Sequence, residues 1–95
     1  MGIAELLRDN REQILALARR HGVSNVRVFG SVARGDARED SDVDLLVDVE
    51  LDVDIEFLGL WVDLEELLAR PVDLVTERSL RPRMREKVLR EAVAL

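Results

Sequence analysis

The sequence contains no cysteine, no tyrosine and only one histidine, His21. The absence of cysteine excludes disulfides, thiolate zinc sites and a cysteine nucleophile. A single histidine cannot build a histidine-rich metal centre or an ordinary catalytic triad. His21 itself is expected to be an exposed residue at the end of a helix. Any chemistry that this chain performs must therefore depend on carboxylates.

Long apolar segments are also missing from the sequence. No apolar run approaches the roughly 20 residues that span a bilayer. The first residues lack the basic-then-apolar pattern of a secretory signal. These absences predict a cytoplasmic protein with no membrane partner.

Size and composition are typical of one small folded domain. The 95 residues are 47% hydrophobic and 36% charged, a globular composition that excludes a disordered or collagen-like chain. A chain of this length buries only about two-thirds of the surface that its unfolded form exposes. We expect a single domain over residues 1–95 with a thin core.

The charges are unevenly distributed along the chain. The net charge of -6 argues against broad binding of nucleic acid, which needs a surplus of lysine and arginine. Ten acidic side chains and one arginine lie between residues 36 and 56, whereas residues 78–90 carry six cations and one acid. The first stretch is suited to attract cations, and the second to attract triphosphate oxygens or an acidic partner. The simpler interpretation of the arginines at 78, 81, 83 and 85 is a solvated face.

The hydrophobic pattern alternates between helical and strand periods. The expected elements are a helix over 3–20, a strand over 25–30, a helical turn over 31–34, a strand over 43–49, a helix over 55–69, a strand over 72–75 and a last helix capped by Ser79. In that last helix the inward residues are expected to be Met84, Val88, Ala92 and Leu95. The order αβαβαβα predicts an α/β (α+β) fold in which helices flank a small mixed β-sheet.

The helix expected over 55–69 is richer in apolar residues than one buried face requires. Leu60 and Trp61 lie about 100° apart on a helix, so the two side chains cannot both face the centre of the core. We expect Trp61 to be a core residue. The alternative is a groove for a partner on this helix.

The segment FGSVARGD places a strand end, a glycine and a serine directly before a helical turn. Gly30 would let the backbone approach a ligand closely, and the amide groups of Ser31 and Val32 could cradle phosphate oxygens. The Ser31 hydroxyl could add a contact. A plain capped connection has the same pattern, so this feature alone identifies no site.

Asp42 and Asp44 are two residues apart at a predicted strand, and they therefore project from the same face. Two like charges side by side repel, which makes the arrangement costly unless a cation lies between them. Magnesium suits such a site because it takes oxygen ligands from one or two carboxylates and from substrate phosphates. The alternative is a solvated strand start in an acid-rich stretch.

Asp73 is a lone acid between Val72 and Leu74 in an otherwise apolar strand. If that strand lies beside the one with Asp42 and Asp44, three carboxylates meet at one sheet edge. Such a group could hold two metals roughly 4 Å apart, the arrangement used for in-line displacement at phosphorus. The alternative is an edge residue that faces water.

Taken together, GSVARGDAREDSDVDLLV followed by PVDLV resembles the signature of the DNA polymerase beta-like nucleotidyltransferase superfamily. The closest resemblance is to its minimal nucleotidyltransferases (MNT), which are often paired with HEPN-domain toxins. It covers nearly the whole chain, because the segment after Pro71, with VDLVTERSLRP and REAVAL, also resembles the C-terminal part of these proteins.

The resemblance implies roles for individual residues. Gly30 and Ser31 correspond to the phosphate-binding turn, and Asp42 and Asp44 to two metal ligands. Asp73 matches a third metal-binding carboxylate that helps to activate the acceptor hydroxyl. Arg34 lies in a variable part of the motif, and a phosphate contact for it is a hypothesis.

The resemblance also implies an activity and a partner. Members of the family transfer AMP from ATP to a hydroxyl with Mg²⁺, two ions being expected here. In the toxin-paired group the acceptor is a tyrosine of the HEPN partner, and this modification makes the protein a type VII-like antitoxin that acts in a hetero-oligomer. This chain has no tyrosine and cannot modify itself in that way.

Two other functions remain open at this point. The chain could be a non-catalytic antitoxin that neutralises its partner by burying a surface. It could also transfer a nucleotide to a small molecule or an RNA end.

Overall fold

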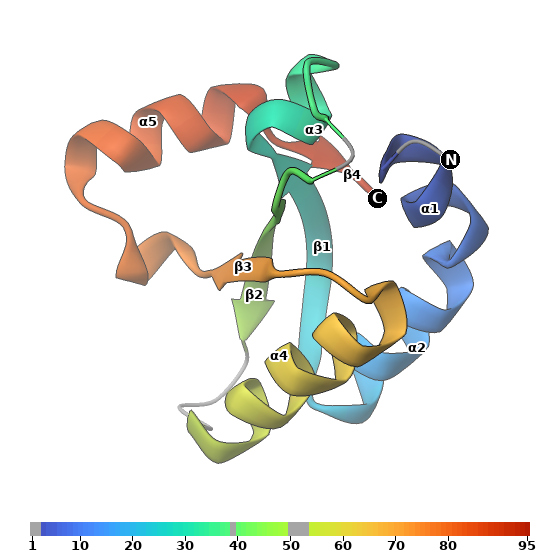
Figure 1. Ribbon diagram of the computed structural model, residues 1–95. Coiled ribbons are helices and arrows are strands. Elements are labelled where there is room, and N and C mark those ends of the chain that lie inside the picture. The colour runs from blue at the N-terminus through green and yellow to red at the C-terminus, as the bar shows by residue number, and fades with distance from the viewer. Residues whose placement is uncertain (1–2, 39, 50–53) are drawn as a thin grey trace.

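The computed structural model describes residues 3–38, 40–49 and 54–95, with the side chains of residues 54–56 left out (Figure 1). Parts of the acid-rich stretch, at 39 and 50–53, lie outside the described residues. The elements are α1 (Ile3–Asp9), α2 (Arg11–Arg20), β1 (Val23–Phe29), α3 (Gly30–Arg34), β2 (Val43–Val49), α4 (Asp54–Leu68), β3 (Val72–Val75), η1 (Glu77–Ser79), α5 (Pro82–Glu91) and β4 (Val93–Ala94). None of the described helices is long and apolar enough to cross a membrane.

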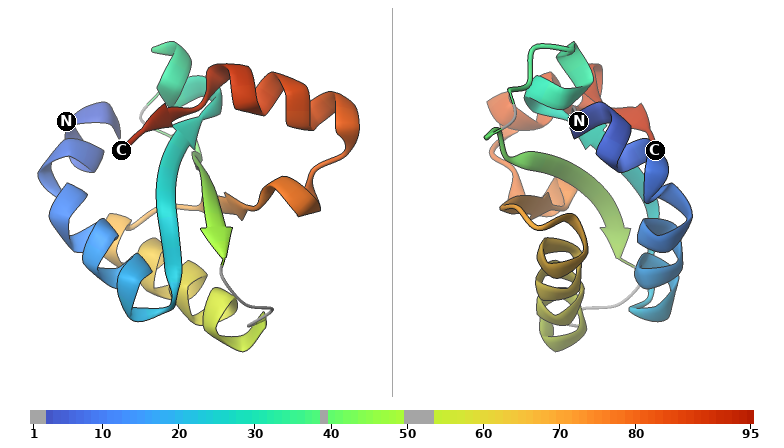
Figure 2. Two further views of the ribbon diagram at one scale, coloured as in Figure 1. Left: turned by 180° about the vertical axis from the view of Figure 1, so that it is seen from behind. Right: turned by 45° about the vertical axis from the view of Figure 1, so that its right-hand side comes forward.

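The four strands form one mixed sheet in the order β3-β2-β1-β4. β1 is antiparallel to both β2 and β4, whereas β2 and β3 are parallel. A parallel pair needs a long crossover, and α4 provides it. The right-hand view of Figure 2 shows α1 and α2 along one side of the curved sheet, with α4 below it.

The two faces of the sheet carry cores of different size. The larger cluster joins the sheet to α1, α2 and α4, and it contains Val43, Leu45 and Val47 of β2. The smaller cluster consists of Phe29, Leu46 and Val88, with partly buried neighbours in β3 and on either side of α5, namely Val75, Leu80 and Ala92. Since successive strand residues point to opposite faces, Asp44 lies on the face of the smaller cluster. Asp73 lies on that face too, because Val72 and Leu74 on either side of it belong to the larger cluster.

The N-terminal helix expected over 3–20 is divided in two. Asn10 ends α1, with its side-chain amide donating to the carbonyl of Leu6 at 2.8 Å. Buried residues on both sides of the break, Ile3 and Leu7 before it and Ile14 after it, continue the helical spacing. The spacing of hydrophobic residues therefore does not reveal the break at Asn10, which the side-chain hydrogen bond of this residue produces.

The C-terminal prediction was wrong in two respects. Ser79 is the last residue of the 3-10 helix η1, where it forms a capping box with Thr76. The following helix, α5, begins only at Pro82. The helix also stops at Glu91, and the next residues form β4, which pairs with β1. This pairing gives hydrogen-bond partners to an edge of β1 that a longer helix would leave open.

The expected inward residues of the last helix have different environments. Val88 is buried, and Ala92 packs partly against the smaller cluster. Leu95 is partly buried against the larger cluster. Met84 is 49% exposed, so its expected core position was wrong.

Trp61 and His21 both attach α4 to its neighbours. The expectation of a core position for Trp61 is confirmed: it is partly buried against the larger cluster, and its ring N–H donates to the carbonyl of Val72. The prediction of an exposed His21 was wrong, because its ring lies 3.1 Å from the Asp63 carboxylate and its side chain is only 18% exposed. A histidine at a helix end can pack its ring against the next layer, which a single-helix pattern does not show.

Truncation of Val88 tests how firmly α5 is attached. Val88 is 1% exposed, whereas the adjacent Leu89 is 40% exposed. Val88→Ala is expected to lower the free energy of unfolding by about 1–3 kcal/mol through a cavity under α5. Leu89→Ala, the matched control, should cost less than about 0.5 kcal/mol. Urea unfolding measures both, and equal costs would contradict this packing.

Candidate active site

The aspartates of β2 and β3 lie side by side on the face of the smaller core. Asp44 and Asp73 are register partners on adjacent parallel strands, and Phe29 is the partner of Asp44 on β1. Neighbouring strands are about 4.8 Å apart, so the sheet itself brings the two carboxyl groups together. Asp42 lies just before β2 and is exposed.

The turn after β1 places a glycine directly against Asp44. Gly30 has φ 72°, and a Cβ at this position would overlap the Asp44 carboxylate. Only glycine has both the left-handed backbone and the missing side chain that this approach requires. In Figure 1, α3 stands at the same end of the sheet as the last turn of α5.

Gly35 closes the short helix that follows. It has φ 82°, and its backbone N–H donates to the carbonyl of Val32 at 3.2 Å. The next N–H, of Asp36, donates to the carbonyl of Ser31 at 3.0 Å. These two hydrogen bonds cap the C-terminal end of α3, with Gly35 in the left-handed backbone conformation. They also hold the Gly30–Ser31 turn in a defined shape.

Electrostatic crowding is concentrated on Asp44. Burial is the main cause that raises the pKa of this carboxyl to about 6, and the charges of Asp73 and Asp42 contribute to the same shift. Arg34 opposes the shift and Glu91 adds to it. The charged form of Asp44 is therefore disfavoured in this environment, and a divalent cation would relieve the repulsion.

The three aspartates do not close into a ready-made metal cluster. In the described ranges, no three acidic, histidine or cysteine side chains are gathered tightly enough to hold a metal ion as they stand. The strands that carry Asp44 and Asp73 are adjacent, as expected, whereas Asp42 precedes β2 and acts on Asp44 through its charge. Like charges repel, so the three carboxylates have no attraction of their own that draws them together. Their all-oxygen donor set suits Mg²⁺.

Arg34 is engaged with two carboxylates. Its Nε donates to Asp36 at 3.3 Å, and its Nη1 donates to both oxygens of Glu91 at 3.1 and 3.2 Å. These hydrogen bonds, Glu91 first, raise the pKa of the guanidinium. Sequence reasoning missed Glu91, because 57 positions separate it from Arg34 and no spacing rule connects them.

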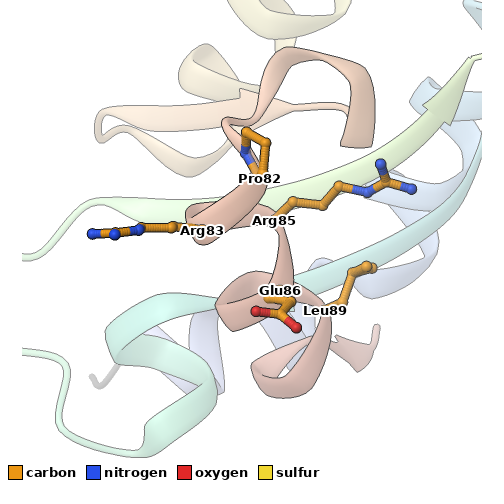
Figure 3. A pocket seen from close by; sticks show the side chains of 5 residues that line it. All are labelled: Pro82, Arg83, Arg85, Glu86 and Leu89. Atoms are coloured by element: carbon orange, nitrogen blue, oxygen red, sulfur yellow. The ribbon is translucent and has the colours of Figure 1, made fainter.

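The cationic segment forms a separate feature on α5. Pro82, Arg83, Arg85, Glu86 and Leu89 line a pocket of about 360 Å³ (Figure 3). Figure 3 shows Arg83 and Arg85 pointing to opposite sides of the helix. Arg85 also lies 3.6 Å from Glu77. The pocket lining includes neither Asp44 nor Asp73, so the two features are distinct.

The raised pKa of Asp44 predicts a pH-dependent gain from Asp44→Asn. The folded-state pKa of about 6 lies above the ordinary 3.8, so wild-type stability falls as pH rises between these values. The unfavourable contribution is complete above that window and absent below it. Above this pH window, Asp44→Asn is expected to raise the free energy of unfolding. Because Asp44 is only partly buried, solvent screening limits this gain to about 1 kcal/mol.

Urea unfolding without divalent ions at about pH 4 and about pH 7.5 measures this difference. A gain of equal size at both values would contradict it.

Two glycines allow a matched test of the close approach. Gly30 and Gly35 both have positive φ, but a Cβ at Gly35 would meet nothing within 4 Å. Gly35→Ala is expected to cost about 1–2 kcal/mol of stability from backbone strain alone. Gly30→Ala must also displace Asp44, which adds about 1–3 kcal/mol. Equal losses in urea unfolding would show that Gly30 does not touch Asp44.

Comparison with known proteins identifies the sequence family. A model of the nucleotidyltransferase domain matches residues 11–95. The protein adenylyltransferase MntA of Thermococcus cleftensis is 49% identical over 78 residues, which are 81% of this chain and 79% of the relative. A provisionally assigned protein adenylyltransferase of Methanocaldococcus jannaschii is 34% identical over 88 residues, 92% of this chain and 95% of the relative.

Solved structures agree with the sequence comparison. A structure assigned to a minimal nucleotidyltransferase has a TM-score of 0.86 at 56% identity and covers 97% of this chain and 95% of that one. A crystal structure of a toxin-antitoxin with AMP-PNP has a TM-score of 0.75 at 28% identity, covering 90% and 71%. The predicted fold, a small mixed sheet flanked by helices, is confirmed. The chain is a nucleotidyltransferase and belongs to the nucleotidyltransferase domain family, among its minimal members.

Proposed function

We propose that this chain transfers AMP from ATP to a tyrosine hydroxyl of a cognate HEPN-type toxin and thereby acts as an antitoxin. The observation that carries the proposal is the pairing of Asp44 with Asp73 on one face, with the Gly30 turn packed against Asp44. Paired carboxylates next to a turn of this kind suit a phosphate-containing substrate that binds together with divalent cations.

The relatives support the choice of nucleotide and partner. One relative is named protein adenylyltransferase MntA, and one toxin-antitoxin structure contains AMP-PNP. A structure of the toxin-antitoxin MntA-HpeT carries aspartate-to-glutamate substitutions two positions apart, the spacing of Asp42 and Asp44 here. Another structure of that pair carries a tyrosine-to-alanine substitution.

Asp42, Asp44 and Asp73 are the residues that would hold Mg²⁺, two ions in our proposal. When bound, the metal neutralises the triphosphate and lowers the pKa of the attacking hydroxyl. The partly buried Asp44 anchors the group because its strand is fixed on both sides by β1 and β3. Asp42 and Asp73 are more exposed and can adjust to the ligand.

The remaining residues handle the nucleotide and the proton. Gly30 and Ser31 would bind phosphate oxygens through backbone N–H groups and the serine hydroxyl, and Arg34 would add a cation. The acceptor oxygen forms a bond to the α-phosphorus, the bond to the bridging oxygen breaks, and pyrophosphate leaves. Asp73, which is exposed, would receive the hydroxyl proton.

The acceptor must come from another molecule. The chain has no tyrosine, and Asp42 and Asp73 are both exposed. An open site of this kind can receive a side chain that protrudes from a folded partner.

Incubation with ATP, Mg²⁺ and the partner toxin tests the activity. We expect the partner to gain the mass of one adenylate, and Asp42→Ala together with Asp44→Ala to reduce the rate by at least about 10³-fold, because both proposed metal ligands are lost. Asp9→Ala together with Glu12→Ala removes the same charge from exposed positions and should leave the rate unchanged. Intact mass spectrometry gives the readout, and an unmodified partner at saturating ATP would falsify the proposal.

A second function, neutralisation by binding alone, is favoured by the outer surface of α4. Leu58 and Val62, one helical turn apart, are 59% and 54% exposed and offer an apolar contact. If binding alone is the function, the Asp42→Ala, Asp44→Ala variant still suppresses toxicity in cells, and Leu58→Ser with Val62→Ser abolishes the suppression. The catalytic proposal instead requires the Asp42→Ala, Asp44→Ala variant to lose suppression, so this variant separates the two functions.

A further inference from the structure

Glu91 occupies an unfavourable place for a carboxylate. It is the last residue of α5, where the helix dipole presents its negative end. Its side chain is nevertheless only 19% exposed. Helix stability therefore does not explain an acid at this position, and its contacts must be sought outside α5.

Those contacts are with the turn that follows β1. Both Glu91 oxygens accept from Nη1 of Arg34, while Asp36 accepts from Nε of the same guanidinium. Neither carboxylate bonds to Nη2 in these contacts. Since a guanidinium has five N–H donors in a fixed plane, the two acids can orient Arg34 and leave donors for a further anion.

The position of Glu91 is fixed from both sides. Before it, Val88 anchors α5 in the smaller core. After it, Val93 pairs with Val28 in the sheet, and the N–H of Leu95 donates to the carbonyl of Val26 at 3.1 Å. The backbone of Glu91 is thus fixed between the smaller cluster and the sheet, which makes this residue a firm support for a flexible arginine.

Arg34 also belongs to the element that borders Asp44. It is the last residue of α3, a helix of five residues whose first residue, Gly30, lies directly against the Asp44 carboxylate. The guanidinium that Glu91 holds therefore extends from the turn that forms one side of the proposed site.

We propose that Glu91 is a positioning residue, which holds the Arg34 guanidinium at the turn so that it is in place for the phosphates of the nucleotide. This inference rests on the proposed function and deepens it. It makes the C-terminal segment, α5 with β4, a part of the nucleotide site. The hydrogen bonds that Arg34 donates to Glu91 already restrict the arginine side chain. Phosphate binding therefore costs less conformational entropy.

Affinity for AMP-PNP in the presence of Mg²⁺, measured by calorimetry, tests the inference without any acceptor. Glu91→Ala is expected to weaken binding about five- to tenfold, because Arg34 is no longer oriented. Glu91→Gln keeps an acceptor oxygen and should lose only about two- to threefold. Glu66→Ala, which removes an exposed glutamate of α4, is the charge-matched control and should bind like wild type.

A double-mutant cycle separates positioning from general damage. If Glu91 acts through Arg34, then adding Glu91→Ala to Arg34→Ala should not weaken binding further. In steady-state assays, Glu91→Ala should raise the KM for ATP and change kcat less than about twofold.

Several outcomes would overturn the inference. Unchanged or tighter binding by both Glu91→Ala and Glu91→Gln would show that Glu91 does not help Arg34 or competes for it. Independent, additive losses in the cycle would show a structural role instead. If Glu91→Ala fails to fold, Glu91→Gln decides the matter alone. In all these cases the proposed function stands, whereas a wild-type protein that does not bind AMP-PNP would overturn both.

Discussion

The close approach of the Gly30 backbone to the Asp44 carboxylate is the constraint on which the site depends. Asp44 lies in a strand with neighbours on both sides, and Asp73 is its register partner. Burial and like charge raise the pKa of this carboxyl to about 6, so the ionised form of Asp44 lowers the stability of the fold. Such a cost is typical of functional sites, where a ligand supplies the compensating charge.

The unequal cores explain how so small a chain tolerates this cost. The larger cluster joins α1, α2 and α4 to the opposite face of the sheet, away from the aspartates. The smaller cluster beside the aspartates has three buried members, and only Val88 among them comes from a helix. Stability therefore resides mainly on one face, which leaves the other with room for polar groups and solvent.

The sequence was sufficient to predict most of the helices and the two strands that carry acidic site residues, because these elements follow from local periodicity. The strand with Asp44 and the strand with Asp73 were predicted with their observed bounds. Local patterns failed where a distant contact decides the structure. β4 forms because β1 has a free edge, and Glu91 meets Arg34 only after the whole sheet is assembled. The break at Asn10 depends on a side-chain hydrogen bond that hydrophobic spacing cannot show.

α5 makes different contacts on its inner side, at its end and on its outer side. Its inner side is attached through Val88, its last residue contacts the turn through Arg34, and its outer side carries the pocket between Arg83 and Leu89. The lining of this pocket includes neither Asp44 nor Asp73, so its shape does not select an acceptor at the aspartates. Charge can hold a triphosphate, but selection of one hydroxyl among many needs a larger contact. For the proposed transfer to a partner hydroxyl, that contact would lie outside the aspartates, on surfaces such as α4 and α5.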